Sequence, residues 1–283
     1  MPACLAGGEA GINHRPVLRV SAALRSVEKW LTAPCRFDSC PYSYALFGFP
    51  DIRMGGRVVC MPQPEALISI ISILSRIRLR WRRLRRPLPP SVVATAWADR
   101  AFQFLDLLFV FDLYEAVSNR LTPGLRRLSP RERILLQPIF GDSVPYDLIR
   151  IDERAQLGPR QYRFLYVSFH TINSWGPISE PTLVHEVVHV WQYVHHGALY
   201  IPRALAAQRT AAGYDYGGLP GLRAAESLLS FNYEQMADVI EDAYRLANGY
   251  PAQWLGGRTA EALPNYYRFM YDLRVRQLPQ PYW

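Results

Sequence analysis

Residues 182–197 read TLVHEVVHVWQYVHHG and contain four of the six histidines of the chain. Ser179 and Pro181 lie just before this stretch and Gly197 closes it, which is typical of an α-helix with a polar N-cap, a proline in the first turn and a glycine after the last. The residues between the histidines are mostly apolar. We therefore predict a helix whose apolar sides are buried.

The motif HExxH lies within this helix and consists of His185, Glu186 and His189. Residues four apart on a helix differ by about 40° in azimuth and lie one turn apart, so both imidazoles can reach one ion. Zinc favours imidazole ligands, and a catalytic zinc site keeps one position for water, from which Glu186 can take a proton. The alternative is a surface stripe of polar residues. A polar trio on an otherwise apolar helix needs partners, however, and a metal ion provides them.

The same helix contains two further histidines that are candidates for the third ligand. His195 has the position that the pattern HExxHxxGxxH gives to a ligand, but Gln192 replaces the glycine that would bend the chain. If the helix continues, His195 turns away from the metal, and His196 lies about 10 Å along the axis from His189. We interpret both as residues near the negative end of the helix dipole.

A better candidate for the third ligand lies in NYEQMAD, residues 232–238. Glu234 and Asp238 are four apart and share one face of a predicted helix. Glu234 can be the carboxylate ligand, and Asp238 can accept the second ring N–H of a ligand histidine. The alternative is an ordinary acidic helix face, which also carries Glu241 and Asp242.

Two other segments are candidates for contacts with a substrate. The loop GYDYGG contains Tyr214 and Tyr216, either of which can donate a hydrogen bond to a developing oxyanion; a packed aromatic loop is the alternative. The segment FLYVSF, residues 164–169, alternates like a strand and can lie at a sheet edge, where an extended peptide would pair. We expect His170, which follows it, to be structural.

The charge of the chain is concentrated in one segment. Of the net +8, much comes from RIRLRWRRLRR at residues 76–86, whereas a nucleic-acid binder shows basic residues throughout, so we do not expect nucleic acid as a partner. The preceding apolar run, residues 66–74, is shorter than the roughly 20 residues of a membrane span. Residues 66–86 can contact an anionic membrane surface or form a solvated tether, and the sequence leaves both open.

The prolines of RRPLPPS, residues 85–91, mark a boundary. We expect an irregular segment containing Cys, Arg and Pro at residues 1–90, with its four cysteines as free thiols, and one folded domain at residues 91–283. The first residues have no apolar core of a signal peptide. The expected elements of the domain are a helix over 92–117, a helix that Ser129 begins with a capping box, strands over 146–151 and 164–169, the HExxH helix, and a helix over 233–247 that Asn232 caps.

Three stretches between residues 128 and 244 together resemble a bacterial family of HExxH proteins. They read LSPRERILLQPIFGDSVPYDLIRI, LVHEVVHVWQ and FNYEQMAD. Members of this family are commonly encoded with, or fused to, type VI secretion (Vgr/Rhs-associated) and extracellular contractile injection systems. The N-terminal third of the chain lies outside the resemblance.

The resemblance implies a zincin-like metallopeptidase. Together with the predicted elements, we expect an α+β fold that is mainly helical with a small β-sheet, and a poorly ordered basic N-terminal segment beside it. His185 and His189 match the metal ligands of the family and Glu186 its base. Glu234 matches a glutamate of the downstream helix, which we take as the third, gluzincin-type ligand of Zn²⁺. The separation of His189 and Glu234 along the chain exceeds that of thermolysin-like enzymes. The expected activity is hydrolysis of a peptide bond in a peptide or protein substrate.

Three hypotheses about the role of the chain remain open at this point. In the first, it is a secretion-system effector that stays in the bacterial cytoplasm until a contractile system exports it. In the second, the HExxH helix is a catalytically silent, zinc-stabilised scaffold, and the chain is a binding or loading module that docks to a secretion-apparatus protein through its basic segment. In the third, the chain is a membrane-surface toxin in which residues 66–81 contact lipid.

Overall fold

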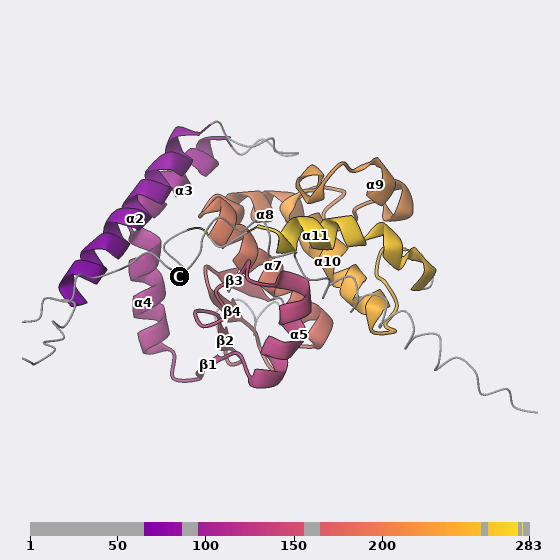
Figure 1. The fold of residues 1–283 in the computed structure, drawn as a ribbon, viewed down its shortest axis with the longest axis horizontal. Helices are drawn as coiled ribbons and strands as arrows, with labels where there is room; N and C mark the ends of the chain where they lie inside the picture. The colour runs from indigo at the N-terminus through magenta and orange to yellow at the C-terminus, as the bar shows by residue number, and fades with distance from the viewer. Residues whose placement is uncertain (1–64, 87–95, 156–164, 256–259, 277–278, 280–283) are drawn as a thin grey trace, which may run out of the picture. The chain divides into compact units, whose positions relative to one another are not determined.

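The computed structural model of the chain describes residues 65–86, 96–155, 165–255, 260–276 and 279. This part of the chain is mainly helical, with one short strand between the third and fourth helices of the following series and three after the fourth (Figure 1). The elements are α2 (Glu65–Arg85), α3 (Ala96–Leu107), α4 (Val110–Leu121), β1 (Leu125–Arg127), α5 (Pro130–Phe140), β2 (Arg150–Asp152), β3 (Tyr166–Ser168), β4 (Thr171–Asn173), α7 (Glu180–His196), α8 (Tyr200–Gln208), α9 (Gly218–Ala224), η2 (Leu228–Ser230), α10 (Tyr233–Ala247), η3 (Ala260–Asn265) and α11 (Tyr267–Arg274). The α+β class with a small sheet is confirmed.

Within the described residues, the strands form one four-stranded sheet in the order β1-β2-β4-β3. β2 and β4 are parallel and the outer pairs are antiparallel, so β3 lies at one edge. Ile151 and Ile172 are neighbours in the centre of the sheet and are fully buried. The strand predicted over residues 146–151 is only partly right, because Tyr146 turns back and its hydroxyl donates to the carbonyl of Gly141 before β2 begins.

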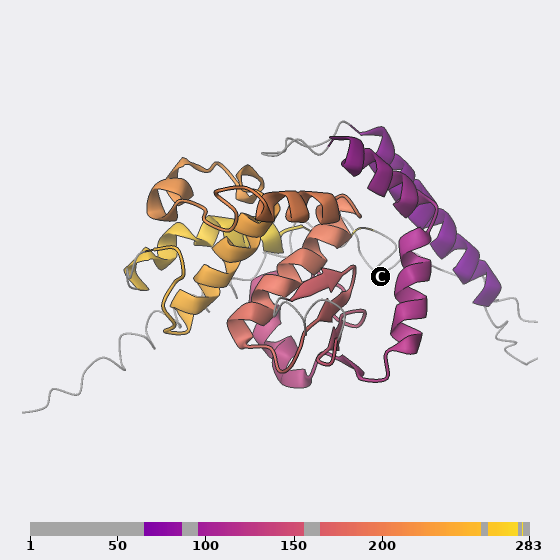
Figure 2. The same ribbon diagram turned by 180° about the vertical axis from the view of Figure 1, so that it is seen from behind.

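α7 and α10 lie side by side at the centre of the fold, and α7 also contacts β3 and β4 (Figures 1 and 2). The caps predicted from the sequence are confirmed. Ser179 accepts a hydrogen bond from the backbone N–H of Thr182, and Asn232 forms a capping box with Gln235. Gly197 ends α7 with φ 78°, a conformation that suits glycine. All residues from 183 to 194 are buried, so this helix forms the core around the site.

The single helix predicted over residues 92–117 is wrong, because the chain breaks between α3 and α4. Phe109 adopts φ 59°, a left-handed conformation that bulky residues rarely adopt. The guanidinium of Arg80 lies 4.3 Å from the centre of the Phe109 ring. Arg80 also forms ion pairs with Asp106 at 3.2 Å and Asp112 at 2.6 Å, one on each side of the break. Tertiary contacts therefore stabilise this helix break, and no glycine or proline in the sequence indicates it.

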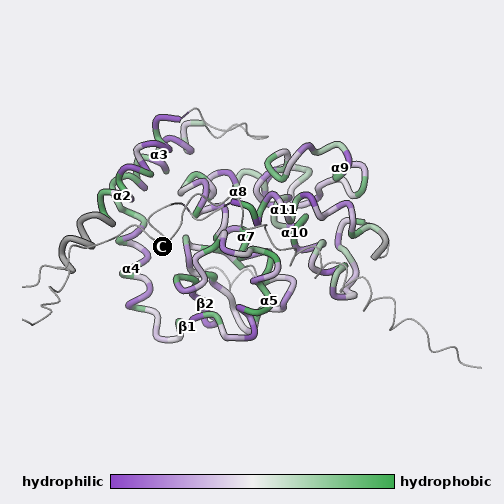
Figure 3. Tube along the Cα trace, in the orientation of Figure 1, coloured by the Kyte–Doolittle hydropathy of each residue, from purple (hydrophilic) through white to green (hydrophobic). Residues whose placement is uncertain are grey.

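The prediction of an irregular segment over residues 1–90 is wrong for α2, which is helical. Residues 65–85 form a helix that packs on α3, because Arg80 is buried against α3 and α4 while Arg83 donates to the carbonyl of Val194 in the last turn of α7. Hydrophobic and hydrophilic residues alternate along its described part (Figure 3). Among the described helices, none is long and apolar enough to cross a membrane. Contact with an anionic membrane surface stays a prediction, and residues 1–64, with the four cysteines, lie outside the described residues.

Candidate metal site

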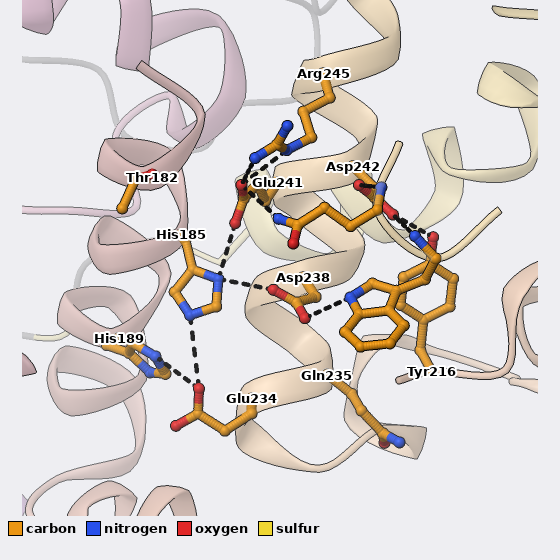
Figure 4. Close-up of polar contacts among 12 residues, drawn as sticks. Thr182, His185, His189, Tyr216, Glu234, Gln235, Asp238, Glu241, Asp242 and Arg245 are labelled. Carbon is orange, nitrogen blue, oxygen red and sulfur yellow. Dashed lines mark hydrogen bonds and ion pairs between the residues drawn. The ribbon is translucent and has the colours of Figure 1, made fainter. Parts of the chain in front are cut away.

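Two side chains of α7 and one of α10 converge at one point (Figure 4). Nε2 of His185 lies 3.5 Å from Oε2 of Glu234, and Nε2 of His189 lies 3.4 Å from the same oxygen. Ligand atoms about 2.0–2.1 Å from a tetrahedral zinc ion are about 3.4 Å apart, whereas hydrogen bonds are shorter, at about 2.7–3.2 Å. The three side chains are buried and their donor atoms lie within 4.8 Å of one another, so they can hold a metal ion.

The other ring nitrogen of each histidine faces a hydrogen-bond acceptor. Nδ1 of His185 lies 2.9 Å from Oδ1 of Asp238 and 3.1 Å from Oε2 of Glu241, both on α10. Nδ1 of His189 lies 2.9 Å from Oε1 of Gln192, which is one turn further along α7. When neutral, both rings therefore carry their hydrogen on Nδ1 and direct the lone pair of Nε2 at the third ligand. This is the tautomer that a metal ligand needs.

The two oxygens of the Glu234 carboxylate have separate partners. Oε2 faces the imidazoles, while Oε1 accepts a hydrogen bond of 3.0 Å from the amide of Gln208 on α8. Burial alone would raise the pKa of Glu234, but the nearby imidazoles of His189 and His185 outweigh it and hold that pKa well below its ordinary value. The carboxylate is therefore ionised and directs Oε2 at the point where the two imidazoles converge.

Asp238 occupies the position that the sequence suggested for it, but three other residues of the site were missed. From the sequence alone, Glu241 belongs to an acidic helix face, and Gln192 only replaces the glycine of the longer histidine pattern. Both follow a site residue by three positions on the same helix, Asp238 in one case and His189 in the other, which is the signal that could have found them. Gln208 comes from a separate helix, and no spacing in the sequence relates it to the other residues of the site.

Glu186 lies next to His185 in the chain and lines the same cavity, with an exposed fraction of 6%. Burial raises the pKa of its carboxyl group. The imidazoles of His185 and His189 oppose this effect, and the carboxylates of Glu234 and Glu241 add to it, so that the pKa is raised. A raised pKa suits a carboxylate that takes up a proton and later releases it.

The two tyrosines suggested as oxyanion donors have different surroundings. Tyr214 lines the cavity, and its ring centre lies 6.2 Å from that of His185. Burial raises the pKa of Tyr214 to about 12, so its hydroxyl keeps its proton at neutral pH. Tyr216 is buried elsewhere, with its hydroxyl 2.7 Å from Asp242 and 2.6 Å from the hydroxyl of Tyr266. The structure brings only Tyr214 to the site.

The remaining described histidines lie away from the converging ligands. α7 continues straight to its last residues, so His195 donates to a backbone carbonyl at 2.8 Å and His196 contacts the hydroxyl of Tyr233 at 2.9 Å. Nδ1 of His170 lies 2.9 Å from a carboxylate oxygen of Glu115 and so connects the sheet to α4.

A cavity of about 410 Å³ opens over these residues. It lies between the edge strand β3, the helices α4, α7 and α8, and the loop before α9. Its lining consists of Tyr114, Leu165, Tyr166, Val167, Ser168, Phe169, His185, Glu186, His189, Tyr200, Ile201, Ala204, Leu205, Gln208, Tyr214 and Glu234.

One edge of β3 is partly occupied by the hydroxyl of Tyr200. This hydroxyl donates to the carbonyl of Val167 at 2.9 Å and accepts from the backbone N–H of Phe169 at 3.1 Å. Because backbone groups alternate along a strand, the N–H of Val167 and the carbonyl of Leu165 point to the same edge. Both groups therefore lie on the edge of β3 that the hydroxyl of Tyr200 contacts, next to the cavity.

Comparisons with known proteins found one relevant similarity. No protein-family model matches the chain, and no solved structure matches it. The chain is 25% identical over 156 residues to the type VI secretion system spike protein VgrG2b of Pseudomonas aeruginosa. The matching region covers 50% of this chain and 15% of that protein, so the chain spans a small part of the length of its relative.

Proposed function

We propose that this chain is a zinc-dependent metallopeptidase with a zincin-like fold and a gluzincin-type ligand set. The observation that carries this proposal is the convergence of Nε2 of His185, Nε2 of His189 and Oε2 of Glu234 in a cavity that also contains Glu186. Two imidazoles and a carboxylate suit zinc and leave a fourth position open. A bound zinc ion supplies a Lewis acid that polarises a carbonyl group and lowers the pKa of water.

In this proposal, the side chains of the cavity have separate roles in peptide hydrolysis. Glu186 takes a proton from the attacking water and passes it to the amine that leaves, a role supported by its burial and raised pKa. Tyr214 donates its hydroxyl hydrogen to the oxygen on which negative charge develops. Asp238 and Glu241 hold the ring of His185 in the orientation needed for metal binding.

The edge of β3 gives an extended peptide a place to bind. The backbone N–H of Val167 and the carbonyl of Leu165 can pair with a peptide in the manner of an added strand, while Tyr200 limits the length of that pairing. The substrate is therefore an extended segment of a peptide or protein.

We further propose that the chain acts in type VI secretion. This is supported by its similarity to a type VI secretion spike protein. In this proposal, the partner before export is a protein of the secretion apparatus, and the chain remains in the bacterial cytoplasm until a contractile system delivers it.

Two substitutions test the peptidase proposal. Glu186→Gln should leave the zinc content of the purified chain unchanged and lower the rate of cleavage of a peptide library by about 10²–10⁴-fold. His185→Ala should remove zinc as well as cleavage. Glu226→Gln, at an exposed glutamate on the surface, is the matched control and should change neither.

The outcomes separate the two roles. Zinc-dependent cleavage by the wild-type chain that Glu186→Gln leaves intact contradicts the mechanism. Stoichiometric zinc, stabilisation by zinc and no cleavage of any library peptide favour the alternative of a silent binding or loading module.

A further inference from the structure

One face of α8 connects the metal site to an apolar wall of the cavity. Ile201, Ala204, Leu205 and Gln208 line the cavity, and their spacing of three, four and seven residues puts them on one side of the helix. Gln208 at one end of this face holds the carboxylate of Glu234 at 3.0 Å. The apolar residues therefore begin within one helical turn of the group that positions a metal ligand.

Tyr114 of α4 is part of the same cavity lining. Its ring lies edge-on to that of Phe169, with the ring centres 6.1 Å apart. The next residue, Glu115, fixes α4 to the sheet, because its carboxylate accepts from the backbone N–H of His170 at 2.9 Å and lies 2.9 Å from Nδ1 of the same residue. A helix that lies outside the HExxH resemblance is thus anchored where it shapes the cavity.

Beyond the metal site, the described residues that line the cavity include no charged side chain. The chain has 32 Lys and Arg residues, yet none of them is among the described residues that line the cavity, and the acids that line it are Glu186 and Glu234. A charged substrate side chain placed against this wall would lose hydration without gaining a partner of opposite charge, whereas burial of an apolar side chain there is favourable. The volume of about 410 Å³ is in the range of about 300–1,000 Å³ in which proteins bind small ligands.

We infer that the cavity selects substrates with a bulky apolar side chain next to the peptide bond that is cleaved at the metal site. Leu205 and Tyr114 determine this selection by contacting that side chain. The inference rests on the proposed peptidase function and names the class of its substrates, which are peptide segments with residues such as leucine or phenylalanine at that position.

Binding of acetyl-peptide hydroxamates tests this selection without catalysis. The probes carry Gly, Leu, Phe, Asp or Arg next to the hydroxamate, and their affinities for the zinc-loaded full chain are measured by isothermal titration calorimetry. The Leu and Phe probes should bind on the order of tenfold or more tightly than the Gly probe, and the Asp and Arg probes no more tightly than the Gly probe.

Two variants test whether Leu205 and Tyr114 form the apolar wall that contacts the selected side chain. Leu205→Arg and Tyr114→Ala should each remove most of the preference for the Leu and Phe probes while leaving the Gly probe unaffected. Both side chains are about half exposed, 46% for Leu205 and 53% for Tyr114, so these changes should be tolerated by the fold. The matched control is Leu229→Arg, since Leu229 is 45% exposed and does not line the cavity; it should keep the full preference.

The zinc content of each sample is measured at the same time. A zinc-loaded chain that binds all probes equally, or keeps its preference in both variants, overturns the selection and leaves the peptidase proposal standing. A chain that holds no zinc overturns the proposed function and the selection with it.

Discussion

Gln192→Met removes the acceptor that fixes the ring of His189 while keeping a side chain of similar length. In the folded chain Gln192 is fully buried. Its Oε1 lies 2.9 Å from Nδ1 of His189, and its amide donates to the carbonyl of Tyr233 at 2.8 Å. Methionine can fill this space, but its sulfur is only a weak acceptor, so the ring loses the bond that fixes its tautomer and orientation.

The expected effect on metal binding follows from that lost bond. Removing the partner of a ligand histidine typically lowers metal affinity about 10- to 100-fold, or about 1.4–2.7 kcal/mol. The substitution also leaves the buried Nδ1–H of His189 without a strong partner, while the carbonyl of Tyr233 keeps its hydrogen bond inside α10. A buried group left without a partner costs about 1–3 kcal/mol, so the free energy of unfolding of the zinc-free chain should fall as well.

The assay is a competition titration of zinc against a chromophoric chelator at neutral pH, with thermal unfolding of the zinc-free chain measured in parallel. Gln192→Glu keeps an acceptor and should retain more of the affinity than Gln192→Met. Gln103→Met makes the same change at a residue of α3 that is 5% exposed and outside the site, so it should lower stability and leave the zinc affinity unchanged. A folded Gln192→Met variant that binds zinc as tightly as the wild type refutes the reasoning.

Three further predictions concern the stability of the fold. Arg80→Met leaves the buried carboxylate of Asp106 without this ion-pair partner, whereas Asp112 keeps Arg76. It should lower the free energy of unfolding by about 3–5 kcal/mol, and a calorimetric unfolding temperature equal to that of the wild type would contradict this. Gly197→Ala forces a Cβ into a turn with φ 78° and should cost about 1 kcal/mol or more; an unchanged urea midpoint would rule this out. Burial lowers the pKa of His195 to about 4, below its unfolded value of about 6.5. Between these values the unfolded chain binds more protons, so stability is lost as the pH falls from about 6.5 to about 4, by up to about 3 kcal/mol, and His195→Asn should flatten that part of the profile of unfolding free energy against pH.

The parts of the fold that the sequence predicted correctly depend on local interactions. Ser179 and Asn232 cap the helices that they directly precede, and Ser129 forms the predicted capping box with Glu132 at the start of α5. The capping hydrogen bonds involve residues only three positions apart, so the sequence contains the necessary information.

The parts that were missed depend on contacts between distant segments. The break at Phe109 has no glycine or proline, and the buried arginine that stabilises it lies 29 positions earlier, at Arg80. The strands β1 and β4 are three residues long and too short to give a periodic pattern.

The candidate site shows the same division between local and distant contacts. Glu234 and Asp238 are four positions apart, so the sequence predicts that they share one face of α10, and the resemblance suggests Glu234 as a ligand. Gln208, which holds the second oxygen of Glu234, comes from α8, and its spacing along the chain relates it to no other residue of the site. Tyr214 and Tyr216 are only two positions apart, but the chain turns at residues 212–215. Tyr214 therefore lines the cavity, whereas Tyr216 contacts Asp242.

The central claim is that His185, His189 and Glu234 bind one zinc ion. Anomalous X-ray diffraction at the zinc absorption edge, on crystals of the zinc-loaded chain, tests it most directly. We predict a single strong peak about 2.0–2.2 Å from Nε2 of each of the two histidines and from Oε2 of the glutamate. A peak instead between Nδ1 of His185, Asp238 and Glu241, or no peak at either group, would contradict the account.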